Sequence, residues 1–168
     1  MIRGIAIFGL NGGGKSTLTH ALAKQTGYFE MDAEYLGKLP FSNPRTKNEV
    51  QTAIMGDIEA HPKFILASVT MNWSDEILSN IDIAFWVQAP LEERSRRIRA
   101  REEKRFGVRV LAGGDMYTQQ AEFRKVVENR DSKSVEESAK KLSCPVIVLD
   151  GALPVAKNLE KMLEEVLI

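Results

Sequence analysis

The 168-residue sequence predicts a single α/β domain, residues 1–168, built on a parallel sheet of five strands with helices on both faces. Two observations predict this class. Short apolar runs that suit buried strands recur along the chain, and segments with helical spacing separate each run from the next. We find no internal repeat and no low-complexity linker. In such a sheet ligands bind beyond the carboxyl ends of the strands, so functional residues are expected in the loops that follow them.

The individual elements follow from local signals. Strands are expected at residues 2–8, 28–31, 64–69, 81–87 and 146–149. The first helix follows Lys15 and ends at Gly27, because glycine readily adopts the left-handed conformation of a helix C-cap. The other helices are expected at 46–60, opened by a Thr46–Glu49 capping box, after Pro90, at 117–129, in a short segment capped by Ser134 and Glu137, and after Pro154.

Residues 9–17 read GLNGGGKST and directly follow the first strand. They match G-x-x-x-x-G-K-[ST], a pattern whose backbone N–H groups, at the positive end of a helix dipole, bind phosphate. We expect Lys15 to reach the β- and γ-phosphates of a nucleotide, Ser16 to hold Mg²⁺ and Thr17 to contact the α-phosphate. The alternative is an ordinary glycine-rich turn. The nucleotide-binding residues expected in this stretch are Gly9, Asn11, Gly12, Gly13, Gly14, Lys15, Ser16 and Thr17.

Acidic and hydroxyl side chains follow the second and third expected strands. Asp32 and Glu34 could orient an acceptor hydroxyl, accept its proton or help to hold Mg²⁺. The alternative for Asp32 is a helix N-cap, with Glu34 in the first turn. The third strand runs into FILASVTMNW, which offers Ser68 to a substrate but no acid before Asp75. Asp82 opens the fourth strand and is expected at the opposite edge of the sheet.

Arginines gather in the segment after the fourth strand. Arg94, Arg97, Arg101 and Arg105 recur along one face of the expected helix. One interpretation is a solvated helix in which most charges form ion pairs such as Glu93–Arg97. The other is that two or three of these arginines bind phosphates, which would need no more than that number. The segment at about 103–117 carries Arg109 between glycines and suits a lid that excludes water. Arg130 follows the next helix and is a further candidate to reach an acceptor.

Composition limits the classes of partner. Lys and Arg together number 23, as do Asp and Glu, so neither nucleic acid nor an acidic membrane is a general partner. No apolar stretch approaches the roughly 18 residues that span a bilayer, and the N-terminus lacks a signal-peptide pattern. The single cysteine, Cys144, is expected to be a buried apolar residue. We therefore expect a cytoplasmic protein, monomeric or homodimeric.

The motifs resemble those of the small P-loop kinases, namely nucleoside monophosphate kinases, shikimate kinase and gluconate kinase. GLNGGGKSTLTHALAKQTGYFEMDAEYL is similar to the opening of shikimate kinase, including its paired acids. APLEERSRRIRAR resembles an adenylate-kinase pattern, and FGVRVLAGGDMYTQQAEFRKVVENR resembles a lid and its following helix, shared with a group of uncharacterised bacterial ATP-binding proteins. The triple glycine of shikimate kinase and the Asp-Gly element of monophosphate kinases have no counterpart in ASVTMNW.

The resemblance implies a P-loop NTPase fold with strand order 2-3-1-4-5. It implies that Arg97, Arg101 and Arg109 contact ATP and that Arg130 contacts the acceptor. The expected activity is Mg²⁺-dependent transfer of the γ-phosphoryl group of ATP to a small hydroxyl-bearing acceptor or a nucleoside monophosphate. The expected catalytic residues are Lys15, Asp32, Arg109 and Arg130. The main alternative is a regulatory or vestigial ATP-binding protein that performs no transfer, and a nucleic-acid end kinase is disfavoured by the net charge.

Overall fold

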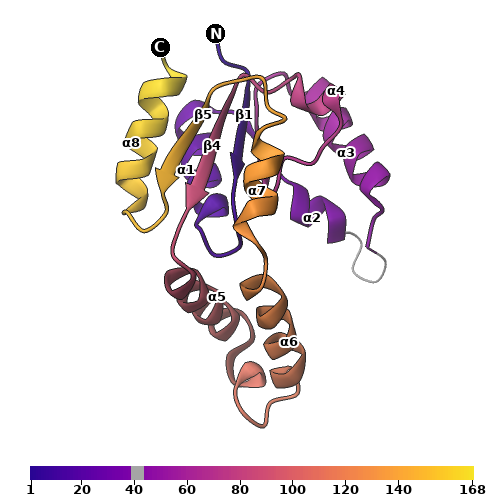
Figure 1. The fold of residues 1–168 in the computed structure, drawn as a ribbon, viewed down its shortest axis with the longest axis vertical. Helices are drawn as coiled ribbons and strands as arrows, with labels where there is room; N and C mark the ends of the chain where they lie inside the picture. Colours follow the sequence, from indigo (N-terminus) through magenta and orange to yellow (C-terminus); the bar gives the residue numbers. More distant parts are fainter. Residues whose placement is uncertain (39–43) are drawn as a thin grey trace.

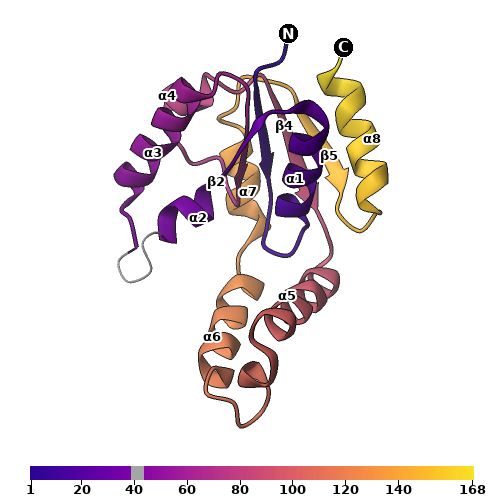
Figure 2. The ribbon, with the colours of Figure 1, turned by 180° about the vertical axis from the view of Figure 1, so that it is seen from behind.

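The computed structural model describes residues 1–38 and 44–168. Figures 1 and 2 show its elements from opposite sides. In chain order these are β1 (Gly4–Phe8), α1 (Lys15–Thr26), β2 (Phe29–Asp32), α2 (Ala33–Lys38), α3 (Lys47–Ala60), β3 (Phe64–Ser68), α4 (Asp75–Leu78), β4 (Ile83–Gln88), α5 (Leu91–Phe106), the 3₁₀ turn η1 (Gly107–Val110), α6 (Tyr117–Glu128), α7 (Ser132–Ala139), β5 (Val146–Asp150) and α8 (Val155–Val166). Each predicted strand is present, with ends within two residues of the predicted ones.

The strands form one parallel sheet in the order β2-β3-β1-β4-β5, which confirms the predicted topology. Phe8 is paired with Ser68 and Asp32 with Ala67. The carboxyl ends of β1, β2 and β3 therefore meet at one edge of the sheet. Asp82 lies at the opposite edge, as predicted, where its carboxylate accepts hydrogen bonds from the backbone N–H groups of Arg3 (2.6 Å) and Gly4 (3.0 Å).

Alternate residues of the strands pack against helices on the two faces of the sheet. Ile5 and Ile7 of β1 lie in a core with residues of α1 and α8, and Ala6 and Phe8 face a second core that includes Val135 of α7. A third core beside it joins α3 and α4 to β2 and β3. Successive side chains of a strand point to opposite faces of the sheet, and both faces are covered by helices. The strands are therefore continuous hydrophobic segments in the sequence.

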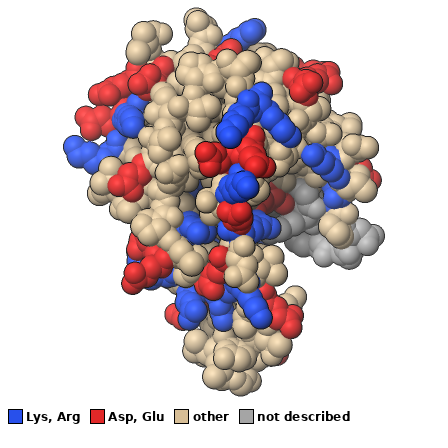
Figure 3. All heavy atoms as spheres, viewed as in Figure 1, with Lys and Arg blue, Asp and Glu red and all other residues tan. Residues whose placement is uncertain are grey.

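Helices α5 and α6 extend beyond the carboxyl edge of the sheet, with η1 at their far end (Figures 1 and 2). A buried ion pair joins the two helices, with Arg124 Nη1 2.5 Å from Glu102 Oε2. The face seen in Figure 3 carries basic and acidic side chains side by side where this extension meets the body. The extension includes the predicted lid segment.

The helix ends test the predicted caps. The Thr46–Glu49 box is present: Thr46 Oγ1 accepts from the N–H of Glu49 (3.3 Å), and Glu49 Oε2 accepts from the N–H of Thr46 (2.6 Å). The cap predicted at Ser134 is wrong. Helix α7 begins at Ser132, and Asp131 caps it by accepting from the N–H of Lys133 (2.8 Å). An aspartate three residues upstream reaches the free N–H groups first, so Ser134 falls inside the first turn.

Candidate functional site

The glycine loop lies between β1 and α1 and packs tightly against its neighbours. Gly12 has φ 80° and Gly14 has φ 99°, a left-handed conformation that costs other residues about 1–2 kcal/mol. A Cβ atom on Gly12 would lie 2.6 Å from the carbonyl oxygen of Arg94 in α5. The glycines of this loop therefore serve both backbone conformation and the close approach of α5.

The first turn of α1 is open at its N-terminus. Its N-cap is Gly14, which has no side chain to accept a hydrogen bond, and Ser16 and Thr17 are exposed. N–H groups in a first helical turn have no partner within the helix and carry the positive end of its dipole. A cavity of about 250 Å³ lies over this turn, lined by Asn11, Gly12, Gly14, Lys15, Ser16, Thr17, Asp32, Glu34, Arg97 and Arg101. This arrangement suits an anion.

Lys15 is buried beneath this cavity, with 9 % of its surface exposed. Its ammonium donates to the carbonyl oxygen of Leu10 (3.3 Å). Burial lowers the pKa of Lys15 from 10.5 to about 8, although the carboxylates of Glu34 and Asp32 oppose the shift. The site thus holds a buried cation that binding of a phosphate would stabilise.

Two arginines of α5 hold the glycine loop through its carbonyl oxygens. Arg97 Nη1 donates to the carbonyls of Gly12 and Gly13, each at 3.3 Å, and Nη2 donates to that of Gly151 at 2.7 Å. Arg94, which is buried, donates to the carbonyl of Asn11 (3.4 Å). Arg94 lies on the predicted arginine face, but its contact with the glycine loop was not predicted. Arg94 lies one helical turn before Ile98, on the side of α5 that is buried, and this spacing could have indicated that Arg94 is buried as well.

The acids predicted at the end of β2 lie in the wall of the cavity. Asp32 Oδ1 accepts from the backbone N–H of Glu34 (2.9 Å), so Asp32 caps α2 as well as lining the cavity. Glu34 Oε1 accepts from the side-chain amide of Asn11 (3.1 Å). Arg130 Nη1 donates to Asn11 Oδ1 (2.6 Å) and lies 3.6 Å from Glu34 Oε1. These contacts join the glycine loop, α2 and the segment after α6.

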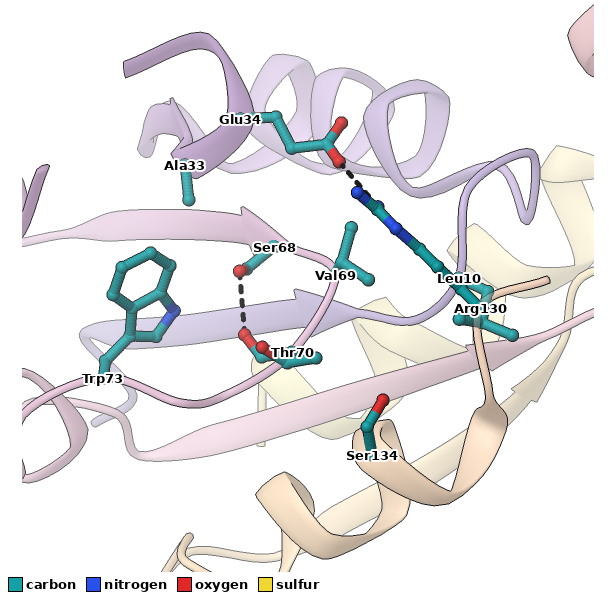
Figure 4. A pocket seen from close by; sticks show the side chains of 9 residues that line it. All are labelled: Leu10, Ala33, Glu34, Ser68, Val69, Thr70, Trp73, Arg130 and Ser134. Carbon is teal, nitrogen blue, oxygen red and sulfur yellow. Dashed lines mark hydrogen bonds and ion pairs between the residues drawn. The ribbon is translucent and has the colours of Figure 1, made fainter. Parts of the chain in front are cut away.

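Figure 4 shows the side chains that line a second cavity, of about 380 Å³. It is lined by Leu10, Ala33, Glu34, Ser68, Val69, Thr70, Trp73, Arg130 and Ser134. Glu34 lines both cavities, so they share a wall. Ser68, which the sequence offers to a substrate, lines this cavity, and its hydroxyl donates to the carbonyl oxygen of Thr70 (2.8 Å). Trp73 packs against the core of α3 and α4 and also lines the cavity.

Arg109 lies elsewhere. Its guanidinium pairs with Asp115 (Nη2–Oδ2, 2.9 Å) within the extension, and both side chains are exposed. Arg109 lines neither cavity. Arg105, also on the predicted arginine face, lies over the ring of Phe106 and lines neither cavity. The structure thus brings together the predicted residues of the loop, β2 and α5, together with Arg130, but not Arg109.

Comparison with solved structures gives the fold. The chain superposes on shikimate kinase from Bacteroides thetaiotaomicron with a TM-score of 0.62, 13 % identity and coverage of 100 % of both chains. The fold is that of the small P-loop kinases. A gluconokinase from Sinorhizobium meliloti (TM-score 0.56, 14 % identity, 98 % and 91 % coverage) and deoxyadenosine kinase from M. mycoides with bound dATP (0.58, 19 %, 100 % and 100 %) have the same P-loop kinase fold.

One curated relative covers nearly the whole chain. It is the uncharacterised protein YqaC of Bacillus subtilis (strain 168), 29 % identical over 173 residues, which are 98 % of this chain and 97 % of the relative. No family model matches the chain. Within the described residues of this P-loop kinase fold, no helix is long and apolar enough to span a membrane.

Proposed function

We propose that the chain is an ATP-dependent phosphotransferase that moves the γ-phosphoryl group to a small acceptor bearing a hydroxyl or phosphate. One observation supports this most strongly: Glu34 lines both the cavity over the glycine loop and the neighbouring cavity of about 380 Å³. A phosphoryl group on the loop would therefore face an acceptor in the second cavity. Phosphoryl transfer requires mainly in-line positioning and neutralisation of charge, and the shared wall suits both.

In this proposal the first cavity binds the triphosphate of ATP. The N–H groups of the glycine loop and of Ser16 and Thr17 donate to phosphate oxygens, and Lys15 neutralises their charge. Arg101 lines the cavity and makes no hydrogen bond within the described part of the chain, so its guanidinium is free to bind a phosphate. Arg97 is already held by loop carbonyls, and we assign it the positioning of the loop as well as contact with the nucleotide.

The oxygen groups around the loop suit Mg²⁺ bound with the nucleotide. Among the described residues, no group of three or more His, Cys, Asp or Glu side chains could hold a metal. Kinases hold Mg²⁺ mainly through phosphate oxygens and water, with one or two protein ligands. The exposed Ser16 hydroxyl would be such a ligand, and the Asp32 carboxylate would hold water bound to Mg²⁺. When bound, Mg²⁺ supplies neutralisation of charge on the β- and γ-phosphates.

The carboxylates next to Lys15 would act on the acceptor. Asp32, held in place by the N–H of Glu34, accepts the proton of the acceptor hydroxyl as the hydroxyl oxygen bonds to the γ-phosphorus. The bond from the γ-phosphorus to the bridging oxygen breaks, and ADP leaves with that electron pair. Glu34 and Arg130 would bind and orient the acceptor, since both line the second cavity.

We propose that residues 103–117 form the lid. Its closure would release Arg109 from Asp115 and bring the guanidinium to the phosphates. Closure also excludes water, which would otherwise compete with the acceptor for the γ-phosphoryl group.

A regulatory protein that binds ATP without transfer is the second candidate. It is favoured by the end of β3, where Ser68 and Val69 stand and no acid follows before Asp75. Many P-loop proteins carry an acid at that point, which holds Mg²⁺ through water. The two candidates differ in turnover and agree in ATP binding.

The test is a screen of small hydroxylated metabolites and nucleoside monophosphates for acceptor-dependent release of ADP. The proposal predicts release with at least one acceptor and its loss in Lys15→Ala, which also loses tight ATP binding while remaining folded. ATP binding without ADP release for any acceptor would favour the regulatory protein. Unchanged nucleotide affinity in Lys15→Ala would overturn the role of the glycine loop.

A further inference from the structure

Asn11 joins the glycine loop to two charged residues of the second cavity. It is buried, with 6 % of its surface exposed. Its amide nitrogen Nδ2 donates to Glu34 Oε1 (3.1 Å), and its Oδ1 accepts from Arg130 Nη1 (2.6 Å). A guanidinium only donates and a carboxylate only accepts, so the amide satisfies both partners in a single orientation. The side chain of Asn11 is therefore a bridge between the two charges.

The main chain of Asn11 is held by α5. Arg94 donates to the carbonyl oxygen of Asn11 (3.4 Å), and a Cβ on the next residue, Gly12, would lie 2.6 Å from the carbonyl oxygen of Arg94. Contacts this close leave the backbone little room to move. The bridge thus starts from a fixed point of the same loop that would bind the phosphates of ATP.

Glu34 and Arg130 remain accessible to a ligand, with side-chain exposures of 38 % and 40 %. Figure 4 shows their charged groups facing one another at one end of the second cavity. The bridge uses Glu34 Oε1 and Arg130 Nη1, and within the described residues Glu34 Oε2 and Arg130 Nη2 make no hydrogen bond. A hydroxyl can donate to the free carboxylate oxygen, and a second oxygen of the same ligand can accept from the free guanidinium nitrogen.

The bridge also opposes direct pairing of the two charges. Glu34 Oε1 and Arg130 Nη1 lie 3.6 Å apart, which is longer than a hydrogen bond, while each of them bonds to the amide. Carboxylate and guanidinium groups favour a closer pair with two parallel hydrogen bonds. If the amide were removed, Glu34 and Arg130 would close into such a pair, and both would be withdrawn from a ligand.

We propose that Asn11 is a positioning residue of the acceptor site. Its amide keeps Glu34 and Arg130 apart and holds both at a fixed place relative to the glycine loop. The acceptor that this arrangement favours is a small molecule whose hydroxyl donates to Glu34 while another of its oxygens accepts from Arg130. This inference rests on the proposed kinase function, because that function makes the second cavity the acceptor site.

The test compares two buried asparagines. Asn158, which is 3 % exposed, donates to the carbonyl oxygen of Asp150 (2.8 Å) and lines neither cavity, so Asn158→Ala is the matched control for Asn11→Ala. The probes are gluconate, shikimate, glycerate and deoxyadenosine 5′-monophosphate, each titrated by calorimetry without ATP. We expect at least one to bind the wild type, with a Kd that rises about tenfold or more in Asn11→Ala and stays unchanged in Asn158→Ala. No binding of any probe to the wild type, or an equal loss in both variants, would overturn the proposal.

A second variant separates positioning from the filling of space. Asn11→Asp keeps the shape of the side chain and an acceptor for Arg130, but its charge repels Glu34, so probe affinity should fall here too. Wild-type affinity in Asn11→Asp would refute the role of Asn11. Loss of probe binding in both Asn11 variants, without ADP release by the wild type when ATP is added, would retain this role and reject the kinase. ADP release with an unchanged KM for the acceptor in Asn11→Ala would reject the role and retain the kinase.

Discussion

Nucleotide affinity is expected to weaken sharply between pH 7 and pH 9 because of Lys15. Burial lowers the pKa of its ammonium to about 8, against an ordinary value of 10.5. Phosphates bind the charged form, whose fraction falls from about 0.9 at pH 7 to about 0.1 at pH 9 for this pKa. The Kd for ATP should therefore rise about tenfold over this range. A lysine with the ordinary pKa would stay charged throughout and leave the Kd unchanged.

The assay is equilibrium binding of ATP at constant ionic strength, with Lys15→Arg as the control. Guanidinium remains charged at pH 9, so the affinity of this variant should not depend on pH over the range. The same shift affects stability with a defined sign: the unfolded chain binds this proton more tightly, so stability from this group rises as pH increases from about 8 to 10.5. Equal ATP affinity of the wild type at pH 7 and pH 9 would refute the assignment of Lys15 as a buried phosphate-binding cation.

Three further predictions concern other parts of the site. Asp32→Asn should lower turnover by about 10²-fold or more with ATP affinity and stability nearly kept, since Asn caps a helix as well as Asp does; near-normal turnover would leave Asp32 as a cap only. Gly12→Ala should lower the free energy of unfolding, measured in urea, by about 2–4 kcal/mol, because the new Cβ would lie 2.6 Å from the Arg94 carbonyl oxygen. Gly27→Ala is the control: Gly27 has φ 73° but open space around it, so this variant should lose only about 1 kcal/mol. Residues 107–116 should gain hydrogen-exchange protection with a bound ATP analogue, and equal protection with and without it would argue against a lid.

Much of the site was predictable because chain order dictates it. The loop joins β1 to α1, and Asp32 ends β2, so parallel pairing brings both to the same edge. The two roles considered for Asp32, a helix N-cap and a carboxylate at the site, do not exclude each other. In the structure the same carboxylate caps α2 and lines the cavity. A pattern of residue types cannot show whether a residue has one of these roles or both.

The contacts that depend on distant segments were not predictable. Helical spacing identified the face that carries Arg97, but not that the loop carbonyls of Gly12 and Gly13 would lie opposite it. Arg130 reaches Asn11 across 119 positions of sequence, and nothing local indicates that pairing. Trp73 likewise packs against two cores, a placement that sequence periodicity does not encode.

The central claim is that the two cavities joined at Glu34 carry out one transfer reaction. It is tested most directly by following ³²P from the γ-position of ATP in the presence of the acceptor that the screen identifies. We predict label in the phosphorylated acceptor with an equal amount of ADP, and a loss of at least about hundredfold in Lys15→Ala. Label that stays in ATP, or that appears only as inorganic phosphate with every acceptor, would contradict the account.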